Sequence, residues 1–207
     1  MFQNRAEAGR RLAEKLEPFQ GQNAVVLALP RGGVAVGYEI AQKLGLPLDI
    51  VVTRKIGHPQ NLEYAIGAVD ESGLTIFNER EEASVERQWL AEEILKQKKE
   101  SARRSDLYRQ GGKSLEIGGK VVIITDDGIA TGLTMRLAVR VVKRQQPAKV
   151  VVAVPVASAE SVSALRSEGA DEVVLLEKPE EFVGAVGAHY QEFEQVSDEE
   201  AIRFLHP

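Results

Sequence analysis

Residues Val121 to Thr134 read VVIITDDGIATGLT, and this stretch decides the fold. Its first part is an apolar run without polar alternation, which is typical of a strand buried on both faces of a parallel sheet. Asp126 and Asp127 follow the run, a loop of small residues comes next, and Thr134 opens a helical pattern. Because ligands collect outside the carboxyl ends of parallel strands, this order of features predicts a ligand site.

Similar apolar runs occur on both sides of this stretch, and each predicts a strand. Helical patterns separate most of them, which is the signature of a doubly wound α/β fold. The runs cover 24–29, 48–53, 149–155 and 171–176, and the helical patterns cover 34–44, 134–145 and 159–168.

The composition excludes several classes of protein. The chain has 207 residues, with 26 Lys and Arg against 31 Asp and Glu, 3 His and no Cys. Without Cys there are no disulfides, thiolate nucleophiles or Cys-ligated metal sites. The acidic balance argues against a protein that coats nucleic acid, and no apolar run is long enough for a membrane span or a secretory leader. We therefore expect a cytoplasmic protein with neither nucleic-acid nor membrane partners.

Three regions fall outside the alternation of strands and helices. The first, Arg5 to Leu16, predicts an amphipathic helix at the start of the chain. The charged stretch 78–110 contains good helix formers and neither Gly nor Pro, so it predicts a long helix. Its apolar residues are sparse, which fits either a solvated helix packed by one thin stripe or a partner-binding arm. In the tail, Ser197 and Glu200 predict a capping box before a short last helix.

The loop after the aspartates has the features of a phosphate site. A helix N-terminus preceded by small residues presents free backbone N–H groups and the positive end of the helix dipole. Gly132 allows close approach of the backbone, and Thr131 and Thr134 can add hydroxyl donors. Asp126 and Asp127 would repel a phosphate, so we expect them to face sugar hydroxyls or a cation of the same ligand.

This combination resembles the phosphoribosyl pyrophosphate (PRPP) binding motif of type I phosphoribosyltransferases. The resemblance implies an α/β fold with an open parallel-sheet core over 1–176, helices on both faces, a helical insertion at about 78–110, and a C-terminal hood over 177–207. It also implies that Asp126 and Asp127 contact the ribose of PRPP. The 5′-phosphate would be held by Ala130, Thr131, Gly132, Leu133 and Thr134. Gly128 departs from the family pattern, which has an aliphatic residue there.

Two upstream stretches extend the resemblance. ALPRGGVAVGYEIA (Ala28 to Ala41) is similar to the diphosphate loop of the family, although its spacing is neither G-x-G-x-x-G nor a Walker P-loop. TRKIGHPQNLEYAIGAV (Thr53 to Val69) comes directly after the second predicted strand, and in the family a mobile loop follows this region and closes over the site. The first stretch implies that Arg31, Gly32 and Gly33 bind the diphosphate. The second supplies the candidate catalytic residues Arg54, Lys55 and Glu63, with His58 and Asn61 as further candidates.

The tail is faintly similar to the hood of hypoxanthine–guanine phosphoribosyltransferases, where a Phe stacks on the purine. Phe182 matches that Phe, although a role in the hood core is equally compatible, and Pro155 is grouped with it as a candidate base contact. His189 stands where that family has an acidic metal contact, so this role is not transferred.

The resemblance implies transfer of ribose 5-phosphate from PRPP to a nucleobase or similar nitrogen acceptor, with release of diphosphate. Mg²⁺ would be bound with PRPP, without a direct protein ligand set, and a homodimer is one expected assembly. Ala130 stands where 6-oxopurine enzymes have an Asp that handles the base proton, and Glu63 is the candidate replacement. Ala130 and the atypical hood motivate the alternative, a non-catalytic PRPP-binding regulatory protein. A nucleotide-binding reductase is disfavoured by the missing G-x-G-x-x-G.

Overall fold

The computed structural model describes the backbone of residues 1–207 and every side chain except that of Glu63. The core is a parallel sheet, in which the central strand lies in register with both neighbours, Ile123 pairing with Val26 and Val151. In spatial order the strands are β2 (Leu48–Ile50), β1 (Ala24–Ala28), β6 (Val121–Thr125), β7 (Lys149–Val154) and β8 (Glu172–Leu175). The predicted α/β class is confirmed.

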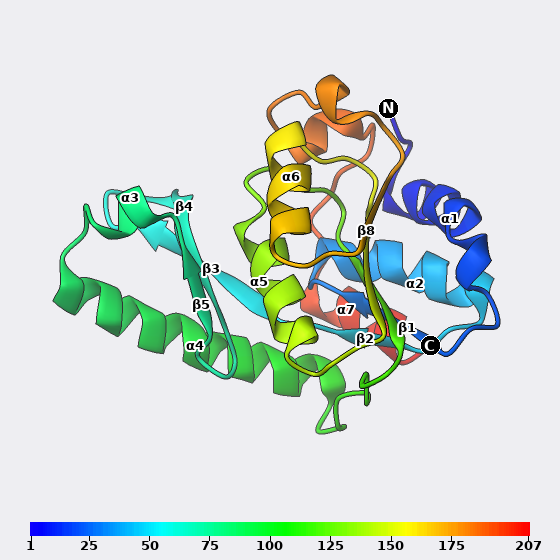
Figure 1. The fold of residues 1–207 in the computed structure, drawn as a ribbon, viewed down its shortest axis with the longest axis horizontal. Helices are drawn as coiled ribbons and strands as arrows, with labels where there is room; N and C mark the ends of the chain where they lie inside the picture. Colours follow the sequence, from blue (N-terminus) through cyan, green and yellow to red (C-terminus); the bar gives the residue numbers. More distant parts are fainter.

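Helices cover both faces of this sheet (Figure 1). Successive residues of β6 serve the two faces, because Ile123 packs with the first pair of helices and Ile124 with the second. This double burial is the reason that the strand shows no polar alternation. The first pair is α1 (Arg5–Lys15) and α2 (Gly32–Leu44), and the second is α5 (Leu133–Lys143) and α6 (Ala159–Ser167).

The apolar run 48–53 does not form one strand. β2 ends at Ile50, and after Val51 and Val52 the chain enters a second, antiparallel sheet of β3 (Thr53–His58), β4 (Asn61–Asp70) and β5 (Thr75–Phe77). The stretch 53–69, which carries the candidates Arg54 and Lys55, therefore forms a β-hairpin. The hairpin is held on both faces, since Ala68 packs against α5 and Val69 packs against the helix described next.

The charged stretch 78–110 forms two helices. A single turn, α3 (Glu79–Glu82), is followed by the long α4 (Arg87–Arg109). Leu90 of α4 packs on the hairpin, whereas Tyr108 packs near β2, so the helix spans from the second sheet to the first. Figure 1 shows these helices and the hairpin as an arm beside the core, and residues 53–109 are called the arm below.

The tail returns to the N-terminal segment. After the turns η2 (Pro179–Glu181) and η3 (Val186–His189), Tyr190 forms a β-bridge with Phe2. The predicted capping box of Ser197 and Glu200 is present at the start of α7 (Asp198–Leu205). A further turn, η1 (Glu17–Phe19), links α1 to β1. Among the described residues, no helix combines the length and the apolar character that crossing a membrane requires.

Candidate active site

The acidic pair lies at the carboxyl end of β6. Asp126 Oδ1 accepts a hydrogen bond from the Asp127 N–H at 2.8 Å, and Asp127 Oδ2 accepts one from Arg5 Nε at 2.8 Å. The Tyr190 hydroxyl donates to the Asp127 carbonyl at 2.6 Å. Arg5 also lies 3.9 Å from the centre of the Phe193 ring, so the first helix and the tail meet at the pair.

Both carboxyls hold protons more readily than free aspartates do. Burial raises the pKa of Asp126 well above its usual range, and the neighbouring charge of Asp127 adds to the rise. Burial also raises the pKa of Asp127, although the Arg5 guanidinium opposes this effect. Such a pair favours a ligand that supplies hydroxyl donors or positive charge, such as a sugar diol or a cation.

The predicted diphosphate loop lies directly against this pair. A Cβ atom on Gly32 would lie 1.9 Å from Asp127 Oδ2, and one on Gly33 would lie 2.8 Å from Asp126 Cα. The peptide bond between Pro30 and Arg31 is cis. The loop can approach the acidic pair this closely only because both positions are glycine.

The predicted phosphate cradle, residues 130–134, is the loop that leads into α5. Its Ala130 carbonyl accepts a hydrogen bond from Ser161 Oγ of α6 at 2.8 Å, and Gly132 has a left-handed φ of 77°. In the described part of the chain, none of the successive N–H groups from Ala130 to Met135 donates a hydrogen bond. These donors, at the N-terminus of an 11-residue helix, suit an anion.

A cavity of about 670 Å³ opens between the cradle and the arm. Ala130 and Thr131 line it on one side, and Tyr64 lines it on the other. Its wall carries charges of both signs, from Arg80 and Arg136 and from Glu79 and Glu160. The cradle is therefore accessible from the side of the hairpin.

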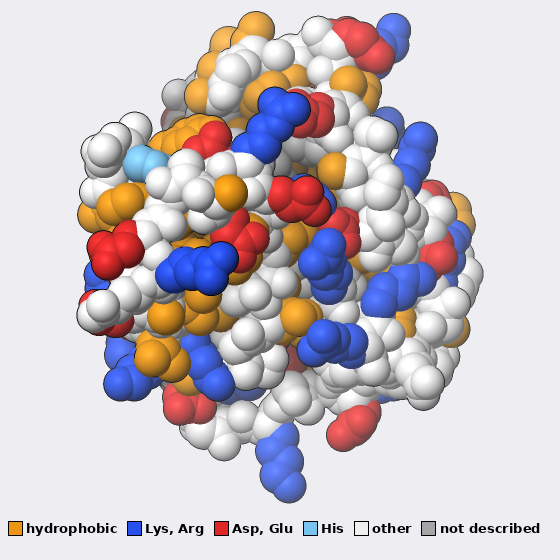
Figure 2. Space-filling view, turned by 60° about the vertical axis from the view of Figure 1, so that its left-hand side comes forward, with side chains coloured by type: hydrophobic (Ala, Val, Ile, Leu, Met, Phe, Trp, Pro, Cys, Tyr) orange, Lys and Arg blue, Asp and Glu red, His pale blue; other side chains and the backbone are white. Residues whose placement is uncertain are grey.

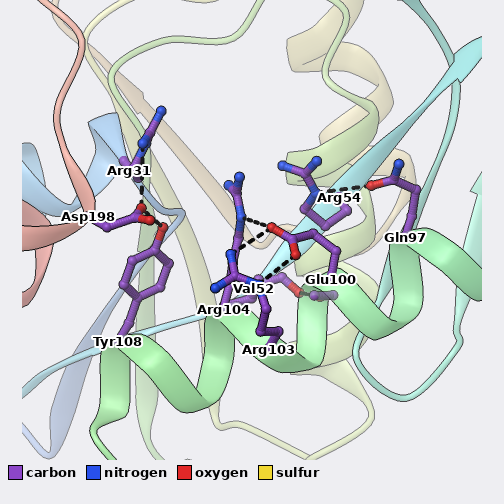
Figure 3. Close-up of polar contacts among 10 residues, drawn as sticks. Arg31, Val52, Arg54, Gln97, Glu100, Arg103, Arg104, Tyr108 and Asp198 are labelled. Atoms are coloured by element: carbon purple, nitrogen blue, oxygen red, sulfur yellow. Dashed lines mark hydrogen bonds and ion pairs between the residues drawn. The ribbon is translucent and has the colours of Figure 1, made fainter.

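The predicted basic residues Arg31 and Arg54 have separate partners. The Arg31 Nη1 lies 3.5 Å from Asp198 Oδ1, and the Arg54 Nε donates to Gln97 Oε1 of α4 at 3.2 Å (Figure 3). Thr53, beside Arg54, donates through Oγ1 to the Thr134 carbonyl at 3.3 Å, which joins the hairpin to the cradle. Lys55 is exposed, since successive residues of a strand alternate between its faces.

The structure brings together Asp126, Asp127, the diphosphate loop and the cradle. The candidate Glu63 has its side chain outside the described residues, and its role stays a prediction. Sequence reasoning missed Arg5 and Ser161, because they reach the site from other helices. Arg5 is 122 residues from its partner Asp127, and no local pattern marks it.

The tail residues pack mostly on one another. Phe182 stacks on His189 with ring centres 5.3 Å apart, and both nitrogens of that His ring have partners within the tail, Glu177 at Nδ1 and the Val183 N–H at Nε2. The carbonyl of Pro155 accepts hydrogen bonds from the start of the tail. The predicted base contacts of Phe182 and Pro155 stay predictions.

The departure at Gly128 has a packing explanation. A Cβ atom there would lie 2.6 Å from Val186 Cγ1 and 2.9 Å from Val156 Cγ2. Val186 of the tail thus occupies the space that a larger side chain at position 128 would need.

The face that carries the arm has no uniformly basic surface. Figure 2 shows Lys and Arg side chains interspersed with Asp and Glu side chains across it. Since the chain carries a formal net charge of −5, attraction of an anion has to come from local groups such as the cradle amides and Arg31.

Two curated proteins and one solved structure match this chain over nearly its whole length. Two Mycobacterium tuberculosis proteins, from strains CDC 1551 / Oshkosh and ATCC 25618 / H37Rv, are provisionally named phosphoribosyl transferases and are each 40% identical to it over 207 residues. The matches cover 99% of this chain and 46% of theirs, so the chain spans about half the length of these curated relatives. The crystal structure of TT1426 from Thermus thermophilus is 42% identical with a TM-score of 0.81, over 99% of this chain and 97% of that chain.

A more distant structure shares the fold alone. It is a Neisseria gonorrhoeae protein with bound ppGpp, 14% identical with a TM-score of 0.51, over 99% of this chain and 97% of that chain. The family model described as the phosphoribosyl transferase domain matches residues 2–192. The chain therefore belongs to the phosphoribosyl transferase family.

Proposed function

We propose that this protein transfers the 5-phosphoribosyl group of PRPP to a nucleobase or a similar nitrogen acceptor, with release of diphosphate. The observation that carries the proposal is the cradle beside the acidic pair. The free N–H groups from Ala130 to Met135 suit a 5′-phosphate, and Asp126 and Asp127 suit the hydroxyls of a ribose. PRPP contains both groups.

In this reaction the bond between ribose C1 and the diphosphate oxygen breaks, and a bond from C1 to the acceptor nitrogen forms. The acceptor releases a proton, and the products are the N-linked ribose 5-phosphate and diphosphate. Positive charge grows on the sugar as the leaving group departs. The carboxylates of Asp126 and Asp127 would hold the sugar and stabilise that charge, while the cradle fixes the phosphate end.

The leaving diphosphate needs positive partners. Arg31 stands in the loop that contacts the acidic pair, and the guanidinium of Arg54 lies where the arm joins the core. In the described residues no three His, Asp or Glu side chains are grouped to hold a metal, whereas Mg²⁺ commonly uses one or two carboxylates together with substrate phosphates and water. Asp126 and Asp127 fit that pattern, and Mg²⁺ bound with PRPP would supply further positive charge on the diphosphate.

The alternative function follows from the question of which group would take the proton of the acceptor. Ala130 has no carboxyl group that could accept the proton, and Asp127 is already paired with Arg5. These observations favour, as second candidate, a protein that binds PRPP and regulates a partner without turnover.

Diphosphate release separates the two candidates. The protein is incubated with PRPP, Mg²⁺ and a panel of nucleobases, and diphosphate is measured. Acceptor-dependent release supports the transferase. Saturable, Mg²⁺-dependent PRPP binding without release on any acceptor supports the binding protein.

A double substitution tests the site itself. Asp126→Asn with Asp127→Asn should weaken PRPP binding by about 100-fold, because two charged hydrogen-bond acceptors are lost. Asp106→Asn removes an exposed carboxylate of α4 and serves as the control. If the double variant binds PRPP as the wild type does, the site assignment is wrong.

A further inference from the structure

One face of α4 contacts segments that carry or adjoin candidate site residues. Gln97 accepts from Arg54 Nε at 3.2 Å, Ser101 donates to the Val52 carbonyl at 3.0 Å, and Tyr108 donates to Asp198 at 2.7 Å (Figure 3). With Arg104 these positions are spaced by four, three and four residues, which places them on one side of a helix. Arg104 therefore lies between the contacts that lead to Arg54 and those that lead, through Asp198, to Arg31.

The terminal nitrogens of Arg104 are available for a ligand. Its Nε donates to Glu100 Oε1 at 2.8 Å, and its side chain is 21% exposed. Its Nη1 and Nη2 have no partner among the residues that the structure describes. Figure 3 shows the tips of Arg31, Arg104 and Arg54 directed to the same side of α4, with Arg104 in the middle.

The charges of these arginines act on one another. Burial lowers the pKa of Arg54, and the positive charge of Arg104 lowers it further. Burial and Asp198 raise the pKa of Tyr108 to about 12, and the charges of Arg104 and Arg31 both oppose that rise. Half-buried cations that repel one another gain most from a polyanion between them.

Glu100 holds Arg104 in this position. It accepts from Arg104 on one side and from Arg103 on the other, and the hydrogen bond from Arg103 is the largest effect that lowers its pKa to about 2. Glu100 thus stays ionised at neutral pH. Glu100 accepts a hydrogen bond from Arg104 Nε, so the Nη1 and Nη2 groups of Arg104 are directed away from the helix. Two such N–H groups side by side suit phosphate oxygens.

We propose that Arg104, positioned by Glu100, is a ligand of the diphosphate group of PRPP and binds it together with Arg31 and Arg54. The inference rests on the proposed function and deepens it, because it makes the arm a part of the substrate site. The class of ligand is a diphosphate ester or inorganic diphosphate. Ribose 5-phosphate has no diphosphate group, so its binding should not depend on Arg104.

A matched pair of variants tests the inference. Arg103 pairs with the same Glu100 carboxylate and its side chain is 56% exposed, so Arg103→Gln removes a like charge from the same helix while Arg104 keeps its own hydrogen bond to Glu100. Titration calorimetry measures binding of inorganic diphosphate with Mg²⁺, of PRPP, and of ribose 5-phosphate, which has no diphosphate. Thermal melting of each variant reports its folding, and Arg104→Lys serves if Arg104→Gln does not fold.

Arg104→Gln should weaken diphosphate and PRPP binding about 10- to 100-fold, with ribose 5-phosphate binding within about twofold of the wild type. Arg104→Lys should recover part of the loss, and Arg103→Gln should bind all of these ligands as the wild type does. If Arg104→Gln binds diphosphate normally, or if both variants lose it equally, the inference is overturned. A wild type that shows the Arg104 dependence but never releases diphosphate from PRPP overturns the proposed transferase function alone.

Discussion

At the scale of single residues, the two aspartates work against the stability of the unliganded protein. The pKa of Asp126 is raised in the folded chain above the ordinary value of 3.8, mainly by burial. The folded state then binds a proton more tightly than the unfolded state. Folding stability therefore falls as the pH rises from the ordinary aspartate range through the raised pKa. Under the proposed function, Asp126 is kept for binding although its burial lowers the stability of the empty site.

The direction of this pH dependence of stability leads to a prediction for Asp126. Asp126→Asn should raise the melting temperature at pH 7.5 by about 2–4 °C, the shift that about 1 kcal/mol produces in a chain of this length. Because Asn does not titrate, the gain should shrink as the pH is lowered toward 4.5. Melting curves at several pH values, with Asp106→Asn as control, measure it. A gain that is the same at every pH would contradict the electrostatic cause.

The sequence predicts those residues of the candidate site that lie in contiguous motifs. Asp126, Asp127 and the cradle follow one buried strand, and their neighbourhood is dictated by the chain itself. The sequence does not predict the three residues that come to the candidate site from other helices, Arg5, Ser161 and Arg104. The sequence pattern of a helix shows which of its residues are buried, but it does not show which other part of the chain the helix packs against. The close contact of Gly32 with Asp127 also depends on tertiary packing, although two adjacent glycines indicate that another segment approaches the backbone there.

At the scale of elements, the strands and helices of the core could be predicted because double burial leaves long apolar runs. The hairpin could not. Its apolar residues do not alternate, since the register between β3 and β4 shifts on both sides of Gly57. This irregularity leaves Ile66 and Val69 in the same cluster despite their odd spacing. A strand with a bulge looks like a loop when only its sequence pattern is considered.

The start of α6 is the element that supports the cradle. Ser158 caps α6 by accepting from the Ser161 N–H, and the Ser161 hydroxyl donates to the Ala130 carbonyl. Ser161→Ala should cost about 1 kcal/mol of folding stability and weaken ribose 5-phosphate binding several-fold, because the cradle loses one of its supports. Ser167→Ala, at the exposed end of the same helix, is the matched control.

Urea unfolding and calorimetry measure the two effects separately. If Ser161→Ala loses stability but binds ribose 5-phosphate as well as the control does, Ser161 stabilises the fold without supporting the phosphate site.

At the scale of the whole molecule, segments from both ends of the chain converge on the acidic pair. Phe2 is fully buried with its ring centre 5.4 Å from that of Tyr190, and its N–H donates to the His189 carbonyl at 2.7 Å. Tyr190 in turn bonds the Asp127 carbonyl, and Arg5 bonds both Asp127 and the Glu194 carbonyl. The geometry of the site therefore depends on packing of the N-terminal segment against the tail.

Phe2→Ala should consequently affect both stability and binding. Removing a fully buried aromatic side chain leaves a cavity and costs about 3–5 kcal/mol. Tyr190 and Arg5 then lose part of their support, so PRPP binding should weaken although Phe2 lies outside the predicted site residues. Val183→Ala, an exposed apolar position of the same tail, should change stability by less than about 0.5 kcal/mol and leave binding intact. Urea unfolding with PRPP titration of both variants checks this, and undiminished PRPP affinity in a destabilised Phe2→Ala protein would mean that the acidic pair keeps its geometry without the N-terminal segment.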